Sequence, residues 1–212
     1  MKNRLLLLAM VALPFFASAQ DTPPATGIKL GISVGSNISF MRNDAPVNYD
    51  PWTGRVAGFT FELPLHKNFA LNTGLYYEQR NYRRDFQMSD TFDPIFYTST
   101  AEYYNHFLTL PVSAKFFFKE NSSIYILGGG YASLFIDDTF KVEGRRLRNS
   151  ADNIQKINAG ATFGAGYRWK IDTQNELNFE LRDNLGLTKG FKNTDGFKSN
   201  TIALLINYQL SL

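Results

Sequence analysis

Six charged residues of mixed sign lie on the polar side of segments that alternate between polar and apolar residues. They are Glu62, Glu78, Lys115, Arg168, Glu180 and Arg182. An isolated charge in a protein interior is costly, whereas opposite charges can pair and satisfy one another. If the alternating segments are strands whose polar faces meet in one interior, the six residues form a lumen charge network.

Signals for catalysis or for a metal are weak. The pentapeptide Gly31-Ile32-Ser33-Val34-Gly35 has the spacing of a nucleophile elbow. That motif needs a helix after its strand, and here a period-two pattern runs through it. His66 and His106 are the only histidines and there is no cysteine, whereas zinc sites need three or four ligands. The sequence predicts no catalytic residue, metal or cofactor.

Arg145, Arg146 and Arg148 form a basic cluster in a polar stretch. Such a cluster is usually a solvated loop. The sharper hypothesis is contact with the phosphates of lipopolysaccharide, because the guanidinium fork fits phosphate oxygens.

Residues 157–182 show which elements would position these side chains. From Ile157 to Lys170 apolar residues alternate with small and polar ones, and the alternation resumes at Glu176 after a short polar turn. A period of two is typical of a strand, so the segment predicts an antiparallel hairpin. The strand at 157–170 is longer than the about 9–11 residues that a tilted strand needs to cross a bilayer.

The same pattern recurs along the chain and predicts eight strands. They are expected at about 27–40, 54–64, 69–80, 103–118, 124–136, 157–170, 176–182 and 200–212. The connections alternate between long and short, with long loops at 41–53, 83–101, 137–153 and 186–199. Pro111 predicts a bulge or local break, because proline cannot donate to a ladder. The facing of 124–136, with its three glycines, stays open.

The first nineteen residues are a predicted signal peptide. Lys2 and Arg4 precede an apolar run over 5–16, and Ala17-Ser18-Ala19 is a cleavage site of small residues. Cleavage after Ala19 leaves a barrel domain at 20–212 with nearly balanced charge, so nucleic acid is not an expected partner.

These observations predict an all-β fold, an eight-stranded antiparallel up-and-down transmembrane β-barrel with short periplasmic turns and long extracellular loops. Hydrocarbon cannot satisfy an open sheet edge, so the sheet must close. The apolar parity should face lipid and the charges should fill the lumen. An interior of eight strands is just wide enough to be filled by side chains, so no open pore is expected.

Five motifs in order resemble a known family. They are the signal peptide ending in ASAQ, a first strand GIKLGISVGSN, the segment YNHFLTLPVSAKFFF, the GGGY strand and the aliphatic final strand. Together they resemble the PorT-family, OmpA-like outer-membrane β-barrel domain of the Bacteroidetes. The resemblance covers nearly the whole mature chain and implies an eight-stranded barrel in the outer membrane.

The leading functional hypothesis is a small, monomeric outer-membrane barrel with a structural or interaction role and no enzymatic activity. Its expected partners are outer-membrane lipid, lipopolysaccharide and other envelope proteins. One alternative is a barrel enzyme that modifies lipids, with His106 as the one candidate base. Another is an exported, soluble, lipocalin-like barrel, which would need its apolar face inside.

Overall fold

The computed structural model describes residues 27–42, 49–89, 96–119, 122–147, 154–190 and 197–212. The predicted signal peptide and Arg148 lie outside these residues. The described residues form nine strands: β1 (Lys29–Arg42), β2 (Asp50–His66), β3 (Phe69–Ser89), β4 (Phe96–Phe117), β5 (Ile124–Val142), β6 (Arg145–Leu147), β7 (Ile157–Lys170), β8 (Asn175–Gly186) and β9 (Lys198–Ser211). No helix in this part of the chain is long and apolar enough to span a bilayer.

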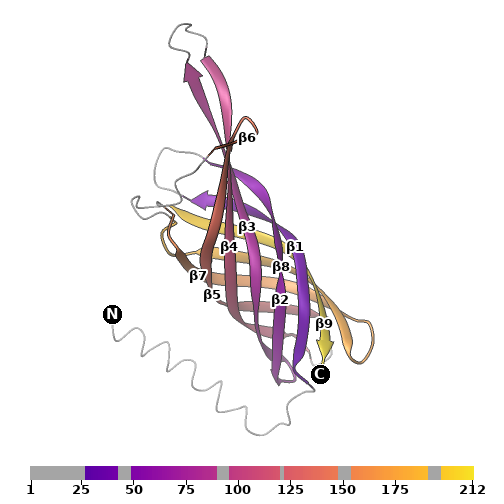
Figure 1. The fold of residues 1–212 in the computed structure, drawn as a ribbon. Helices are drawn as coiled ribbons and strands as arrows, with labels where there is room; N and C mark the ends of the chain where they lie inside the picture. The colour runs from indigo at the N-terminus through magenta and orange to yellow at the C-terminus, as the bar shows by residue number, and fades with distance from the viewer. Residues whose placement is uncertain (1–26, 43–48, 90–95, 120–121, 148–153, 191–196) are drawn as a thin grey trace, which may run out of the picture.

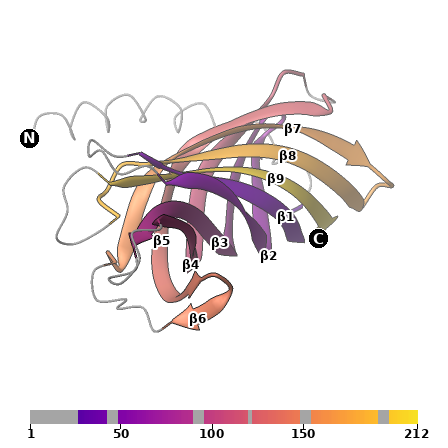
Figure 2. The same cartoon turned by 90° about the horizontal axis from the view of Figure 1, so that it is seen from above.

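Eight of the strands close into an antiparallel ring (Figures 1 and 2). Consecutive strands pair from β1 to β5 and again from β7 to β9. β5 pairs with β7, and β1 pairs with β9, which closes the ring. The predicted up-and-down topology is therefore confirmed. The ninth strand, β6, pairs only with β5 and stands outside the ring.

The apolar parity faces outward and the polar parity faces inward, as predicted. Phe163, Tyr167 and Trp169 expose 53%, 49% and 59% of their surface, whereas Glu180 and Arg182 expose 1% and 3%. Along β9, exposed Leu204 and Ile206 alternate in the same way with buried polar residues. This rules out the lipocalin-like alternative, which requires the opposite facing.

The facing of β5 is now defined. Tyr125, Leu127 and Tyr131 point inward and are buried, and Ile124 and Ile126 point outward. Apolar side chains therefore occupy both faces of this strand. That is why the alternation of residue types could not orient it.

The strands run further toward the extracellular side than predicted, and this corrects the expected long loops. Most of 83–101 is not a loop but the continuation of β3 and β4, which pair from Phe69/Phe116 to Ser89/Phe96. The two strands form an arm that projects beyond the ring (Figure 1). Likewise β2 begins at Asp50 and β5 ends at Val142, inside the expected loops 41–53 and 137–153.

The predicted break at Pro111 is present, but it is not a bulge. Pairing between β3 and β4 is interrupted between Thr73/Val112 and Tyr76/Thr109 without a change of register. The register shift of β4 lies elsewhere, between His106 and Phe107. There β5 carries one extra residue, Ile136, because His106 pairs with Asp137 and Phe107 with Phe135.

A tight turn joins β5 to β6. Glu143 and Gly144 are its two central residues, with φ angles of 50° and 76°. Positive φ at both positions is the requirement of a type I′ hairpin turn. The turn folds Arg145 and Arg146 back beside Val142 and Lys141, their register partners.

Candidate functional site: the lumen charge network and the extracellular rim

The layer of the lumen nearest the short turns is built on Glu62. Lys115 donates to it at 2.7 Å and Lys29 lies 3.4 Å from it. Lys29 also donates to Glu176 at 2.8 Å. The Lys115 and Glu62 side chains are 2% and 1% exposed, so this layer is closed to solvent.

The middle layer joins Glu180 to Arg182. The Arg182 Nε donates to Glu180 Oε1 at 2.8 Å, and the Tyr125 hydroxyl donates to the second carboxylate oxygen at 3.0 Å. The guanidinium of Arg182 also lies over the ring of Tyr76, 4.9 Å from its centre. Glu180 and Arg182 therefore both have partners within the protein and need no bound ion to balance them.

The layer nearest the extracellular side joins Glu78 to Arg80. Arg80 Nη2 lies 2.8 Å from Glu78 Oε2 and also donates to the Ser133 hydroxyl at 2.8 Å. Thr109 donates to the same carboxylate oxygen at 3.0 Å, and Asn184 donates to the other one at 3.3 Å. Glu78 and Arg80 thus each have several hydrogen-bond partners, which buried charges require.

Arg168 points into the lumen but differs from the other five predicted residues. Its Nη2 donates to the backbone carbonyl of Ser122 at 3.1 Å, and its guanidinium lies 4.0 Å from the centre of the Phe117 ring. It therefore anchors the turn between β4 and β5. Glu62, Glu78, Lys115, Glu180 and Arg182 instead form ion pairs.

Sequence reasoning missed three members of the network, Lys29, Arg80 and Glu176. All three lie on the inward-facing parity of predicted strands. Their position in the alternating pattern is therefore the signal that could have identified them. A complete list of inward ionisable residues would have included them.

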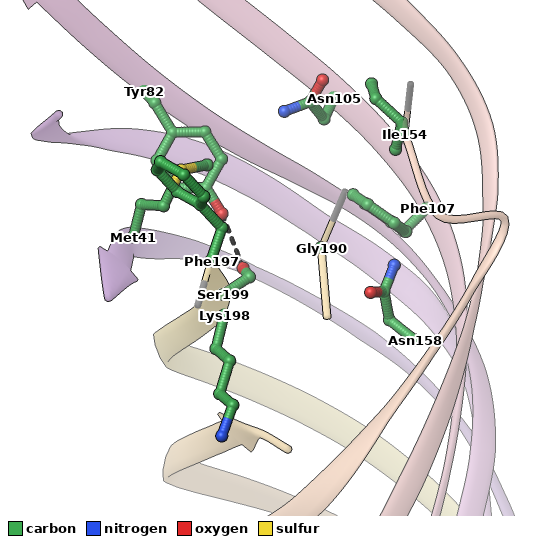
Figure 3. A pocket seen from close by; sticks show the side chains of 10 residues that line it. All are labelled: Met41, Tyr82, Asn105, Phe107, Ile154, Asn158, Gly190, Phe197, Lys198 and Ser199. Atoms are coloured by element: carbon green, nitrogen blue, oxygen red, sulfur yellow. Dashed lines mark hydrogen bonds between the residues drawn. The ribbon is translucent and has the colours of Figure 1, made fainter. Parts of the chain in front are cut away.

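A small pocket lies at the extracellular mouth of the ring (Figure 3). Its volume is about 30 Å³, room for no more than one or two waters. The hydroxyl groups of Tyr82 and Ser199 lie 2.6 Å apart on its wall. Its lining side chains come from opposite sides of the ring: Met41, Tyr82, Asn105, Phe107, Ile154, Asn158, Phe197, Lys198 and Ser199, with Gly190 contributing backbone.

The remaining candidates are dispersed. Ser33 is buried within β1, which confirms the strand interpretation of Gly31–Gly35. His66 ends β2 and is exposed. His106 points outward from β4, where its Nδ1 lies 2.6 Å from the hydroxyl of Tyr77 and the two rings stack.

The predicted basic cluster lies on the extracellular side. Arg145 and Arg146 are exposed on β6, and their side chains leave opposite faces of the hairpin because adjacent strand residues alternate. Arg145 and Arg146 therefore do not act as one patch on a single face.

The comparisons with known proteins define the class. A family model described as an outer membrane protein beta-barrel domain matches residues 18–192, and the chain belongs to this family. The protein is a small outer-membrane β-barrel. None of the curated proteins compared with the sequence matches it.

Several solved structures are similar to it in fold. Ail of Yersinia pestis is 17% identical, with 87% of this chain and 99% of that chain covered and a TM-score of 0.39. Neisserial surface protein A is 12% identical, with coverages of 86% and 97% and a TM-score of 0.46. Outer Membrane Protein W of E. coli is 13% identical, with coverages of 90% and 100% and a TM-score of 0.48.

Proposed function

We propose that this barrel has a filled interior, forms no open pore and serves a structural or interaction role through its extracellular elements. The observation that carries the proposal is the layered lumen, in which the pairs Lys115–Glu62, Arg182–Glu180 and Arg80–Glu78 are all buried. Because these pairs lie at successive levels, an ion would have to displace several buried charges to pass. The extracellular arm of β3 and β4 is then the element most accessible to other molecules.

Conductance in planar bilayers tests the closed lumen. The reconstituted protein is expected to give no stable steps above the lipid baseline, while a sixteen-stranded porin in the same bilayer gives large ones. Large, stable, ohmic steps from this protein would show that the lumen is open and would end the proposal.

The interaction role extends to lipid and to other envelope proteins. Exposed Arg146 supports contact with lipopolysaccharide, and the projecting arm supports contact with a protein. Cross-linking in intact envelopes followed by mass spectrometry tests the second part. If the arm of β3 and β4 gives no cross-link to another protein while residues in the short turns do, the proposed protein contact of the arm is wrong. That the protein is a monomer, and that it belongs to the narrower PorT family, stay predictions.

We also propose that the chain is not an enzyme. The one candidate base, His106, is engaged through Nδ1 with the Tyr77 hydroxyl on the outer surface of the barrel. Lipase and deacylase assays of the parent and of His106→Ala should both stay at background. Hydrolysis by the parent that His106→Ala abolishes would establish the enzyme instead.

A further inference from the structure

Four side chains form a charged row across the extracellular end of the sheet. Arg83 on β3 pairs in register with Glu102 on β4, Glu102 pairs with Lys141 on β5, and Lys141 pairs with Arg146 on β6. Directly paired residues point to the same side of a sheet. The row therefore carries three cations and one carboxylate on one surface.

That surface is the outer one, which continues from the lipid-facing side of the barrel. On β4 every second residue from Leu108 through His106 and Tyr104 to Glu102 has the same facing. On β5 the extra residue, Ile136, exchanges the two faces, because the partner of outward His106 is Asp137. Without this bulge Lys141 would point inward, and bulges commonly redirect side chains in this way.

An aromatic shelf lies directly beneath the row. Trp52 and Tyr104 both pair with Asn81, two residues nearer the membrane than Arg83 and Glu102. The guanidinium of Arg83 lies over the ring of Trp52, and the ammonium of Lys141 lies 5.0 Å from the centre of the Tyr104 ring. Trp and Tyr prefer the depth of the lipid headgroups, so the cations stand at or just above that depth.

The charge of the row is only partly neutralised. Glu102 lies 3.2 Å from Arg83 and accepts a hydrogen bond of 2.8 Å from the Tyr104 hydroxyl. Neither Lys141 nor Arg146 forms an ion pair with a carboxylate among the residues that the structure describes. These two cations are register partners on the outer surface of the sheet and are available to an anion.

We infer that Lys141 and Arg146, supported by Arg83 on the Trp52 shelf, bind a phosphorylated headgroup of lipopolysaccharide in the outer leaflet. The inference deepens the lipid contact proposed above and rests on it. Arg146 supplies a planar fork for two phosphate oxygens, and Lys141 supplies a point charge. Arg145 leaves the other face of β6 beside Val142, so it contributes nothing to this site.

Arg145 provides a matched control, since it has the same side chain in the same strand. Binding of bis-phosphorylated lipid A to the protein in detergent micelles is measured for the parent, for Lys141→Ala/Arg146→Ala and for Arg145→Ala. The double variant is expected to lose about tenfold in affinity, the scale of lost hydrogen bonds to a charged group. Arg145→Ala is expected to bind as the parent does. Equal losses in the two variants, or no loss in either, would overturn the inference.

Dephosphorylated lipid A and inorganic phosphate identify what is recognised. Dephosphorylated lipid A should bind the parent as weakly as lipid A binds the double variant, and inorganic phosphate should compete only at millimolar concentration. Equal binding of the two forms of lipid A by the parent would show that the acyl chains, not the phosphates, are recognised. Heat-modifiable migration of each variant separates a binding loss from misfolding.

A fluorescence measurement gives a second readout, which reports where on the protein the headgroup binds. In a Trp169→Phe background the emission comes from Trp52 alone, since the chain has two tryptophans. Lipid A should shift this emission in the parent and in Arg145→Ala but not in Lys141→Ala/Arg146→Ala. An emission that lipid A leaves unchanged in the parent would place the headgroup away from the shelf. Bilayer conductance is independent of both readouts, so failure here leaves the closed lumen standing.

Discussion

The ring of Tyr125 lies so close to the backbone of Gly166 that a Cβ at residue 166 would overlap its Cζ and hydroxyl oxygen. The two residues are register partners on β5 and β7. The missing side chain lets the Tyr125 side chain pass over β7, so that its hydroxyl reaches Glu180 on β8, the other register partner of Gly166. A glycine on the inward parity thus makes room for a long side chain of the charge network.

Replacing Gly166 should therefore destabilise the barrel. Gly166→Val is expected to cost about 1–3 kcal/mol, the usual penalty for overpacking an interior. Gly128→Ala is the control, because the nearest atom to its Cβ would be Phe163 Cδ1 at an ordinary 3.8 Å. Urea unfolding in lipid vesicles, followed by tryptophan emission, measures both. A Gly166→Val barrel as stable as the parent would mean that the ring can move aside.

Charges placed on the lipid face should hinder assembly. Phe163→Arg and Leu204→Arg each put a guanidinium among exposed apolar side chains, at an expected cost of about 2–4 kcal/mol near the bilayer midplane. Thr162→Ser keeps the hydroxyl that donates to Asn184 at 2.8 Å and should be silent. Heat-modifiable migration on gels compares the three. Arginine variants that fold like the parent would place these positions outside the hydrocarbon.

Breaking one partner of a buried pair should cost more than removing both. Lys115→Met leaves Glu62 with Lys29 at 3.4 Å as its remaining cation. The expected loss is about 3–5 kcal/mol, the usual cost of removing one partner of a buried pair, because the longer contact with Lys29 does not replace the lost hydrogen bond. Lys115→Met/Glu62→Gln should recover much of it.

A double-mutant cycle on unfolding free energies measures this coupling. Additive losses of the two single variants would show that the pair does not act as a unit.

The turn between β7 and β8 should loosen in acid. Hydrogen bonds from the Asn175 side chain, and from the backbone N–H groups of Gln174 and Asn175, lower the pKa of exposed Asp172 below its usual range. A carboxyl whose pKa falls on folding stabilises the folded turn above its unfolded pKa. That contribution is lost as the pH falls through the lowered value.

Amide exchange at Gln174 and Asn175 across that pH range measures the effect. Protection should decline in acid in the parent and be low at every pH in Asp172→Ala. Asp172→Asn keeps an acceptor oxygen and should show no such decline. A parent whose protection is unchanged in acid would contradict the assignment.

The period of two was enough to predict most of the fold, because one face of every strand meets lipid and the other meets charge. It did not orient β5, where inward Tyr125 and Tyr131 are themselves amphipathic. Nor could it reveal the arm of β3 and β4. Beyond the bilayer nothing sorts side chains into apolar and polar faces, so Arg83 and Arg84 follow each other without a pattern.

The site was predictable only in part, for geometric reasons. Inward parity placed Glu62 and Lys115 in one interior, but the stagger of the strands decides which residues meet across it. The separation of Arg145 from Arg146 depends on the Glu143–Gly144 turn. The outward facing of Lys141 depends on one extra residue, Ile136. The alternation of residue types does not predict a bulge at that position.

The seam between β1 and β9 has a consequence for biogenesis. These strands pair over their whole length, from Lys29/Ser211 to Arg42/Lys198. The edge of β1 that pairs with β9 therefore has unsatisfied backbone hydrogen-bonding groups until β9 is in place. During that interval a chaperone or the insertion apparatus must cover this edge. A chain that lacks β9 could not close the ring and should be degraded by periplasmic proteases.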